Sequence, residues 1–175
     1  MSTSEKKTVL VIGYGNILCG DDGLGQKVIE LLIPRLSPNI SQVTDVQVLH
    51  QLDVTLCARL NDYHHIIFVD AQTNLYQNDV VMIDLANKDE AKVRAEQPGF
   101  SAHYLSPEDL LELTGQLYSD CPHGWLAAVK GFQTEPGTGL SAEAVNNAYK
   151  AVESIIQHLN TLAETFSTVD KTENE

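Results

Sequence analysis

One stretch near the amino terminus constrains the fold of this chain more than any other. Residues 8–12 form a continuous run of β-branched and aliphatic side chains, which is typical of a strand that is covered on both faces. Glycines and acids crowd the following loop from Gly13 to Gly25, and apolar residues then recur at helical spacing over residues 24–36. A buried strand, a glycine-rich loop and a helix in this order predict an α/β fold.

Short apolar runs and amphipathic stretches alternate along the rest of the chain, which supports the same fold class. Further strands are predicted over residues 46–49, 66–69, 80–83 and 125–129. Further helices are predicted over residues 52–60, from the Ser106 cap onward, and from Ser141 to about Ala163. We expect a single three-layer α/β domain with a mostly parallel, five-stranded sheet and helices on both faces.

The fourth predicted strand differs from the others in its connection. Only about ten residues separate it from the third strand, whereas a parallel crossover needs about a dozen or more and usually contains a helix. We therefore expect residues 80–83 to form the one antiparallel strand. The polar segment over residues 84–100, which ends in Pro98-Gly99, is expected to be a long loop.

Polar segments flank the predicted domain at both ends. Residues 1–7 are expected to form a polar tail and residues 8–163 the folded domain. Residues 164–175 are polar and acidic, so they have too little apolar surface to bury and are predicted to be a disordered tail. No internal repeat or linker divides the chain.

The charge balance excludes two classes of partner. The chain has 24 Asp and Glu against 11 Lys and Arg, a formal net charge of -13, which repels nucleic-acid phosphates and anionic membranes.

No apolar run reaches the roughly 18 residues of a membrane span. The first residues lack the apolar core of a signal peptide. The three cysteines are odd in number and far apart, so they match neither a disulfide framework nor a Cys-x-x-Cys site, which indicates a reducing compartment. We expect a cytoplasmic monomer that binds neither nucleic acid nor membranes.

The glycine-rich loop does not have the pattern of a nucleotide site. A loop of the form Gly-x-Gly-x-x-Gly requires glycine where Leu18 stands, and Asp21 and Asp22 would repel a pyrophosphate at the helix N-terminus. No Gly-Lys-Ser/Thr follows. The loop instead holds two acids at the carboxyl end of a strand. Either acid also suits a helix cap, and for Asp21 capping and a chemical role stay equally open.

A third acid, Asp70, directly follows the predicted strand over residues 66–69. Open α/β sheets bind ligands at such strand ends, and the flavodoxin-like strand order 2-1-3-4-5 makes the first and third strands neighbours. That order brings Asp22 and Asp70 into one crevice, although Asp70 alone also fits a plain turn. His103 lies in the loop before Ser106, where a lone histidine is most often a surface residue. Together, two carboxylates and an imidazole make a mixed oxygen–nitrogen metal site with open coordination positions.

Several common hydrolase patterns are missing. The sequence has no Gly-x-Ser-x-Gly, no His-Glu-x-x-His and no Asp-Thr-Gly or Asp-Ser-Gly, so serine-hydrolase, zincin and pepsin-type assignments have no local support. Cys19 lies in the glycine-rich loop, so a reactive thiol at this position stays an alternative. His50 ends the second predicted strand, where it would line the edge of the crevice.

Three segments of the sequence resemble the family of nickel–iron hydrogenase maturation proteases. The family's opening pattern, Gly-x-Gly-Asn followed by Asp-Asp-Gly and a further glycine, matches residues 13–25. Its apolar strand ending in Asp-Ala matches residues 66–71, and its loop histidine before a helix matches His103 ahead of Ser106. The resemblance covers roughly residues 8–160.

The resemblance implies a cytoplasmic endopeptidase that removes the C-terminal extension of a hydrogenase large-subunit precursor after nickel has been inserted into it. The family's three metal-contacting residues fall on Asp22, Asp70 and His103, with Asp22 where some members have Glu. Family schemes class such enzymes as aspartic peptidases, which makes Asp22 and Asp70 the candidate catalytic acids and Asp21 a weaker candidate. Nickel is expected to arrive with the precursor and to bind the free protein weakly.

Substrate contacts are expected at Gly13, Gly15, Asn16 and His50. Several family members have Asp-Gly-Gly-Thr where this chain has His50-Gln51-Leu52-Asp53. That departure resembles the branch that serves soluble, NAD-linked bidirectional hydrogenases, and it leaves open which hydrogenase is the substrate.

Two other functions are compatible with the same residues. One is a noncatalytic, chaperone-like module that senses nickel in a partner and cuts nothing, and the other is a cysteine peptidase of similar α/β fold. For a protease, the nickel either acts as a Lewis acid or activates water at the scissile bond. In the alternative mechanism it serves recognition alone while Asp21 or Asp22 assists as base.

Overall fold

The computed structural model describes residues 7–73, 75, 77–87 and 105–172. Its centre is a five-stranded sheet in the order β2-β1-β3-β5-β4, in which only the pair β4 and β5 is antiparallel. The strands are β1 (Lys7–Tyr14), β2 (Thr44–Leu49), β3 (Tyr63–Gln72), β4 (Val80–Asp84) and β5 (His123–Lys130). The predicted fold class, the five strands and the single antiparallel strand are confirmed.

The far edge of the sheet differs from the expected order 2-1-3-4-5. β5 lies between β3 and β4, so β3 has parallel neighbours on both sides and β4 forms the edge. Burial explains the difference, because β5 carries a buried run from Leu126 to Val129 whereas every residue of β4 is only partly buried. A continuous buried run belongs in the centre of a sheet.

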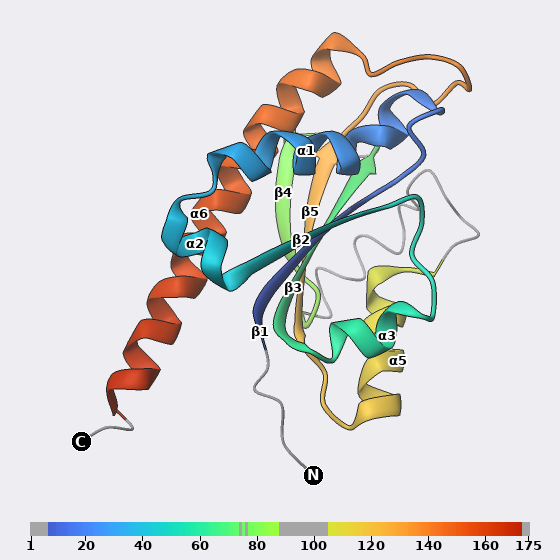
Figure 1. Cartoon of the computed structure of the whole chain (residues 1–175). Coiled ribbons are helices and arrows are strands. Elements are labelled where there is room, and N and C mark those ends of the chain that lie inside the picture. The colour runs from blue at the N-terminus through green and yellow to red at the C-terminus, as the bar shows by residue number, and fades with distance from the viewer. Residues whose placement is uncertain (1–6, 74, 76, 88–104, 173–175) are drawn as a thin grey trace.

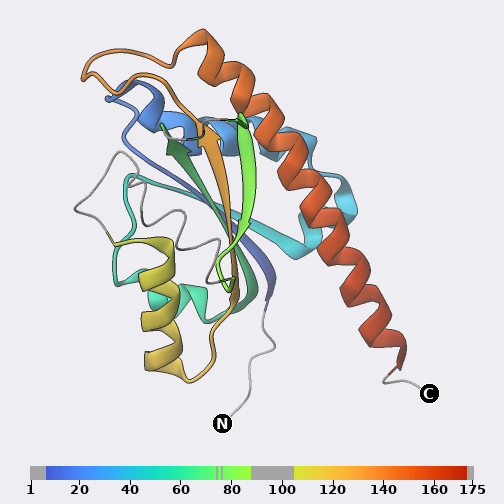
Figure 2. The same cartoon turned by 180° about the vertical axis from the view of Figure 1, so that it is seen from behind.

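Helices cover both faces of the sheet (Figure 1, Figure 2). One face carries α1 (Leu24–Leu32), α2 (Pro38–Val43) and α6 (Ala142–Thr172), and the other carries α3 (Leu56–Leu60) and α5 (Pro107–Tyr118). Alternate residues of β1 divide between the two cores. Val9 and Val11 belong to the core under α1 and α6, and Leu10 and Ile12 to the core under α3 and α5. This arrangement confirms the predicted three layers.

Two helix starts and one helix end follow signals in the sequence. Ser106 caps α5 as predicted, since its Oγ accepts a hydrogen bond of 3.1 Å from the Asp109 N–H. α1 is shorter than predicted, and the chain continues as the 3-10 turn η2 (Ile33–Arg35) because Pro34 disfavours a further α-helical turn. α2 is absent from the predicted elements, although Pro38 in its first turn is a helix-start signal.

The last helix is longer than its pattern predicts. Its start is confirmed, because Ser141 Oγ accepts a hydrogen bond of 3.1 Å from the Ala144 N–H. The helix then continues to Thr172, so it includes residues 164–172 of the segment that the sequence predicts as a tail. No glycine or proline interrupts residues 142–172, so nothing in this stretch breaks the helix. The expected N-terminal tail and long loop lie mostly outside the described residues. None of the described helices is both long and apolar enough to span a membrane.

The start of α1 lies directly against the sheet. A Cβ on Gly25 would lie 2.2 Å from the carbonyl oxygen of Tyr14 in β1 and 2.5 Å from that of Val69 in β3. Only glycine allows so close an approach between a helix and two strands. The contact holds the first turn of α1, and with it the preceding 3-10 turn η1 (Gly20–Gly23), near the carboxyl ends of β1 and β3.

Candidate active site

The glycine-rich loop and Asp70 lie at the same end of the sheet, near the carboxyl ends of β1 and β3. β1 and β3 are parallel neighbours with Gly13 opposite Val69, and Asp70 follows Val69 inside β3. In Figure 1 this is the end of the sheet at which β1 leads into η1 and α1. Because β1 and β3 are neighbours, the loop that carries Asp22 begins at the same end of the sheet at which Asp70 lies.

The partly buried side chain of Asp22 is oriented by its own loop. The Asn16 main-chain N–H donates a hydrogen bond of 2.7 Å to Asp22 Oδ2. The Asn16 side chain shapes the same turn, since its Oδ1 accepts a bond of 3.0 Å from the Leu18 N–H and its Nδ2 lies 3.2 Å from Cys19 Sγ. Asn16 thus controls the position of Asp22 and contacts the Cys19 thiol.

Gly15 and Gly13 have backbone roles in the loop. Gly15 has φ +137°, and a Cβ there would lie 1.8 Å from the carbonyl oxygen of Asp22. A Cβ on Gly13 would lie 2.1 Å from the carbonyl oxygen of Gly25 and 2.5 Å from Ile29 Cγ1. The motif glycines therefore let the loop fold back on Asp22 and let α1 pack on β1.

Asp21 is a fully buried carboxylate with many hydrogen-bond donors. Its Oδ2 accepts bonds from the main-chain N–H of Phe132 at 2.8 Å and of Gln133 at 3.2 Å, and from Ser141 Oγ at 2.8 Å. Its Oδ1 accepts a bond of 2.7 Å from the Ser141 N–H. Asp21 does not cap its own helix, because these donors all belong to the segment that leads from β5 into α6. The contacts favour a structural role over a chemical one.

Asp70 is partly buried and is oriented by a residue of its own strand. The Nε2 of Gln72, which is itself buried, donates a hydrogen bond of 2.9 Å to Asp70 Oδ2. Gln72 also contacts the loop that follows β5, because its carbonyl oxygen accepts a hydrogen bond of 3.0 Å from the Gly131 N–H. Asp70 thus lies in ordered strand backbone rather than in a plain turn.

Gln26 is a residue of this region that sequence reasoning missed. Its Nε2 donates hydrogen bonds to the carbonyl oxygens of Gly15 at 2.8 Å and of Leu49 at 3.3 Å. The Gly15 N–H also donates to Leu49, at 3.3 Å. Gln26 therefore ties the glycine-rich loop to the end of β2, directly before the exposed His50. Gln26 lies one turn before the exposed Glu30, on the polar side of α1, so the sequence pattern gives no signal of this role.

The third predicted metal ligand, His103, lies outside the described residues. Within the residues that the structure describes, no three His, Cys, Asp or Glu side chains are arranged to hold a metal ion. The proposed set of Asp22, Asp70 and His103 therefore stays a prediction.

A second group of titratable side chains lies at the opposite end of β3 and β5. His65 is opposite His123 in the sheet, and their ring centroids are 5.9 Å apart. His123 Nε2 lies 2.9 Å from Asp84 Oδ1. The Trp125 ring contacts the tilted ring of His123 and meets the ring of His158 edge to face. Burial, and then the charges of neighbouring histidines, lower the pKa of His65 to about 4. Burial also lowers the pKa of His158. This histidine cluster is remote from the carboxylates of the candidate site.

Comparison with known proteins gives a result for structures but not for sequences. No sequence-family model and no curated protein matches the chain. The hydrogenase maturating endopeptidase HybD from Escherichia coli is 22% identical with a TM-score of 0.67, over 88% of this chain and 93% of that one. The maturation protease HybD from Thermococcus kodakarensis is 24% identical with a TM-score of 0.65, over 87% and 99%.

A third solved structure extends the similarity. The hydrogenase 2 maturation peptidase from a Thaumarchaeota archaeon is 25% identical with a TM-score of 0.58, over 87% of this chain and 98% of that one. These matches span nearly the whole of each partner, so they compare complete domains rather than a shared substructure. The chain has the fold of the nickel–iron hydrogenase maturation endopeptidases.

Proposed function

We propose that this protein is a hydrogenase maturation endopeptidase that removes the C-terminal extension of a nickel–iron hydrogenase large-subunit precursor after nickel insertion. The observation that carries the proposal is the position of Asp22. The loop whose motif resembles the family orients this carboxylate through the Asn16 N–H, at the sheet edge that also carries Asp70. Solved structures of the same fold are hydrogenase maturation endopeptidases.

The precursor's nickel is proposed to dock on Asp22, Asp70 and His103. Carboxylate oxygens and an imidazole nitrogen suit a divalent first-row metal and leave coordination positions for the precursor's own ligands. Hydrogen bonds already orient the carboxylates, from the Asn16 N–H to Asp22 and from Gln72 to Asp70. Such bonds hold a metal ligand in one orientation and strengthen its binding. Docking of the nickel then places the scissile peptide bond beside Asp22.

Two mechanisms differ in what the nickel does. In the first, the nickel polarises the scissile carbonyl or activates the attacking water. In the second, the nickel serves recognition and Asp22 accepts the proton of the water, which is the sense in which the enzyme would be an aspartic peptidase. Exchange of the precursor's nickel for zinc separates them. A change in kcat supports the first mechanism, and a change in KM at constant kcat supports the second.

The segment after β2 supports a narrower assignment of the substrate. His50 is exposed, and Gln51-Leu52-Asp53 follows it, which resembles the branch that serves soluble, NAD-linked bidirectional hydrogenases. We assign the precursor to that class. We further propose that the protein acts in the cytoplasm as a monomer.

Incubation of the purified protein with the precursor, followed by mass measurement, tests the proposed function. The nickel-loaded precursor should lose the mass of its C-terminal extension, and the nickel-free precursor should stay intact because it lacks the metal that joins the two proteins. Addition of nickel to the protease alone should not replace nickel in the precursor. Equal cleavage of both precursors would refute nickel docking.

The same assay separates the two rival functions. A noncatalytic nickel-sensing module would bind the nickel-loaded precursor and leave its mass unchanged. A cysteine peptidase would lose activity when Cys19 is alkylated, whereas the proposed enzyme should keep it. Cys19→Ser is the matched variant, because a hydroxyl can still accept the contact from Asn16 Nδ2.

A further inference from the structure

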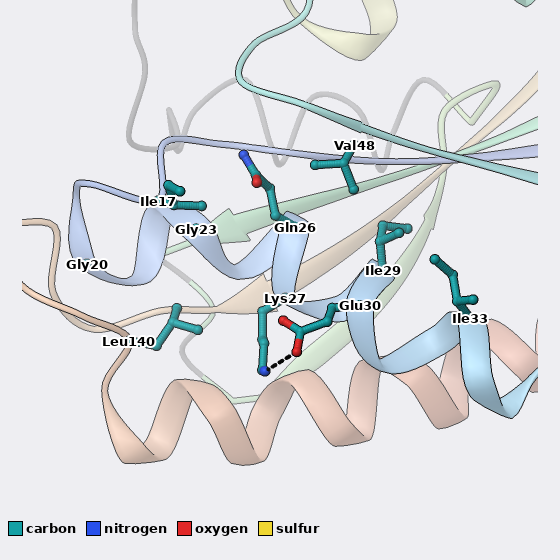
Figure 3. Close-up of a pocket in the computed structure, with 10 residues that line it drawn as sticks. All are labelled: Ile17, Gly20, Gly23, Gln26, Lys27, Ile29, Glu30, Ile33, Val48 and Leu140. Atoms are coloured by element: carbon teal, nitrogen blue, oxygen red, sulfur yellow. Dashed lines mark hydrogen bonds and ion pairs between the residues drawn. The ribbon is translucent and has the colours of Figure 1, made fainter.

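An apolar groove of about 460 Å³ lies beside the glycine-rich loop, between α1 and β2 (Figure 3). Ile17 and Gly23 line it from the loop side, Ile29 and Ile33 from the helical side, and Val48 from β2. Ile17, Ile33 and Val48 are exposed over 60%, 52% and 45% of their surfaces. Contiguous exposed apolar side chains on a soluble domain are typical of a contact surface.

The charges around the groove favour an uncharged occupant. The two ionisable residues that line it, Lys27 and Glu30, form an ion pair of 3.0 Å with each other. The groove is therefore neutral on a chain whose net charge is -13. A partner that recognises it would do so with apolar side chains, because neither sign of charge has a counterpart in the groove.

The groove is continuous with the candidate active site, although neither Asp22 nor Asp70 lines it. Gly23 directly follows Asp22 in η1, and Ile17 belongs to the same loop. Gln26 also lines the groove and donates its hydrogen bond to the carbonyl oxygen of Gly15. A polypeptide whose scissile bond lies at Asp22 therefore reaches the groove within a few residues.

The edge of the sheet adds a second argument for a polypeptide occupant. Among the described residues β2 pairs only with β1, so the other edge of β2 has no strand partner. Extended peptides bind such edges through main-chain hydrogen bonds and insert alternate side chains into adjacent pockets. Figure 3 shows Val48 directed from β2 toward α1, on the side of the strand that such a side chain would enter.

We propose that this groove binds an extended, apolar segment of the large-subunit precursor close to the scissile bond. The inference rests on the proposed function, because that function supplies the polypeptide. The helical wall from Gly23 to Ile33 rises about 15 Å at 1.5 Å per residue, which about four or five extended residues cover. A large apolar side chain of the segment lies between Ile33 and Val48.

Ile33→Glu tests the groove, with Leu117→Glu as the matched control. Ile33 and Leu117 are similarly exposed, at 52% and 58%, but Leu117 lies on α5 at the opposite face of the sheet. For cleavage of the nickel-loaded precursor, Ile33→Glu should raise KM about tenfold or more and change kcat less than twofold. Leu117→Glu should change neither. Ile17→Ser, a substitution in the exposed loop, should raise KM in the same direction without a new charge.

Binding of the nickel-loaded precursor distinguishes failure of the groove from failure of the proposed function. The Kd should rise about tenfold with Ile33→Glu and stay unchanged with Leu117→Glu. An equal Kd for the wild type and both groove variants, with unchanged KM, would overturn the groove. A groove-dependent Kd without any cleavage by the wild type would overturn the endopeptidase and leave the docking surface intact.

Discussion

The main-chain N–H of Asn16 lies 2.7 Å from the carboxylate Oδ2 of Asp22 and donates a hydrogen bond to it. The acid that we place at the centre of the chemistry is thus oriented by loop backbone rather than by another side chain. Its position depends on the conformation of Gly15 and Asn16, so the motif glycine and the motif acid act as one unit.

Asp22→Asn should abolish most of the cleavage while the fold persists. The amide keeps an oxygen that can accept the hydrogen bond from the Asn16 N–H. It removes the negative charge that the side chain needs to bind a metal or to accept a proton from water. We expect kcat/KM for the nickel-loaded precursor to fall about a hundredfold or more, and the free energy of unfolding to change by about 0.5 kcal/mol or less. Asp62→Asn, at an exposed position, is the control. A normal cleavage rate with Asp22→Asn would refute the site.

Gly15→Ala should disturb the loop far more than Gly137→Ala. Both glycines have positive φ, +137° and +83°, so both substitutions carry backbone strain. Only at Gly15 does the added Cβ also meet an atom, the Asp22 carbonyl oxygen at 1.8 Å, whereas nothing lies within 4 Å of it at Gly137. Gly15→Ala should lower both the thermal unfolding temperature and the rate of precursor cleavage, and by much more than Gly137→Ala lowers them. Equal effects would mean that the loop has room for a side chain.

Asp21→Asn should destabilise the fold. One carboxylate oxygen becomes an amide NH₂ group, which cannot accept the hydrogen bonds that the N–H groups of Phe132 and Gln133, or of Ser141, now donate. At least one buried N–H group would then lose its acceptor. The loss should be about 2–3 kcal/mol, as for a buried bond to a charged group. Urea unfolding measures it, and Asp62→Asn again serves as control with a change of about 0.5 kcal/mol or less. If the stability is unchanged and only kcat falls, Asp21 has a chemical role after all.

Stability should fall with acidification because of the histidine cluster. The folded pKa of His65 is lowered to about 4 from 6.5, so the unfolded chain binds the proton first. The contribution of this residue is complete above pH 6.5 and is lost as the pH falls from 6.5 toward 4. His158, His64, His123 and Asp84 face the same region. His65→Gln should flatten this part of the curve of unfolding free energy against pH. An unchanged slope would contradict the lowered pKa.

The amino-acid sequence by itself determined the α/β class, the five strands and the caps of α5 and α6. Each of these depends on a local pattern, such as the apolar run of β1 or the serine before a helix, which residues close in sequence decide. The neighbouring position of β1 and β3 also followed from the topology of such sheets. His103 stays a prediction, because it lies outside the described residues.

The tertiary structure decided the remaining features, because each depends on residues that are far apart in the chain. Asp21 receives its hydrogen bonds from residues more than 110 positions away, so its local pattern fits a helix cap and an active-site acid equally well. The exchange of β4 and β5 depends on which strand the whole core buries. Gln26 joins Gly15 to Leu49, and the groove exists only where α1 packs beside β2. Periodicity in a sequence shows which side of an element is buried, but only packing decides which other element covers it.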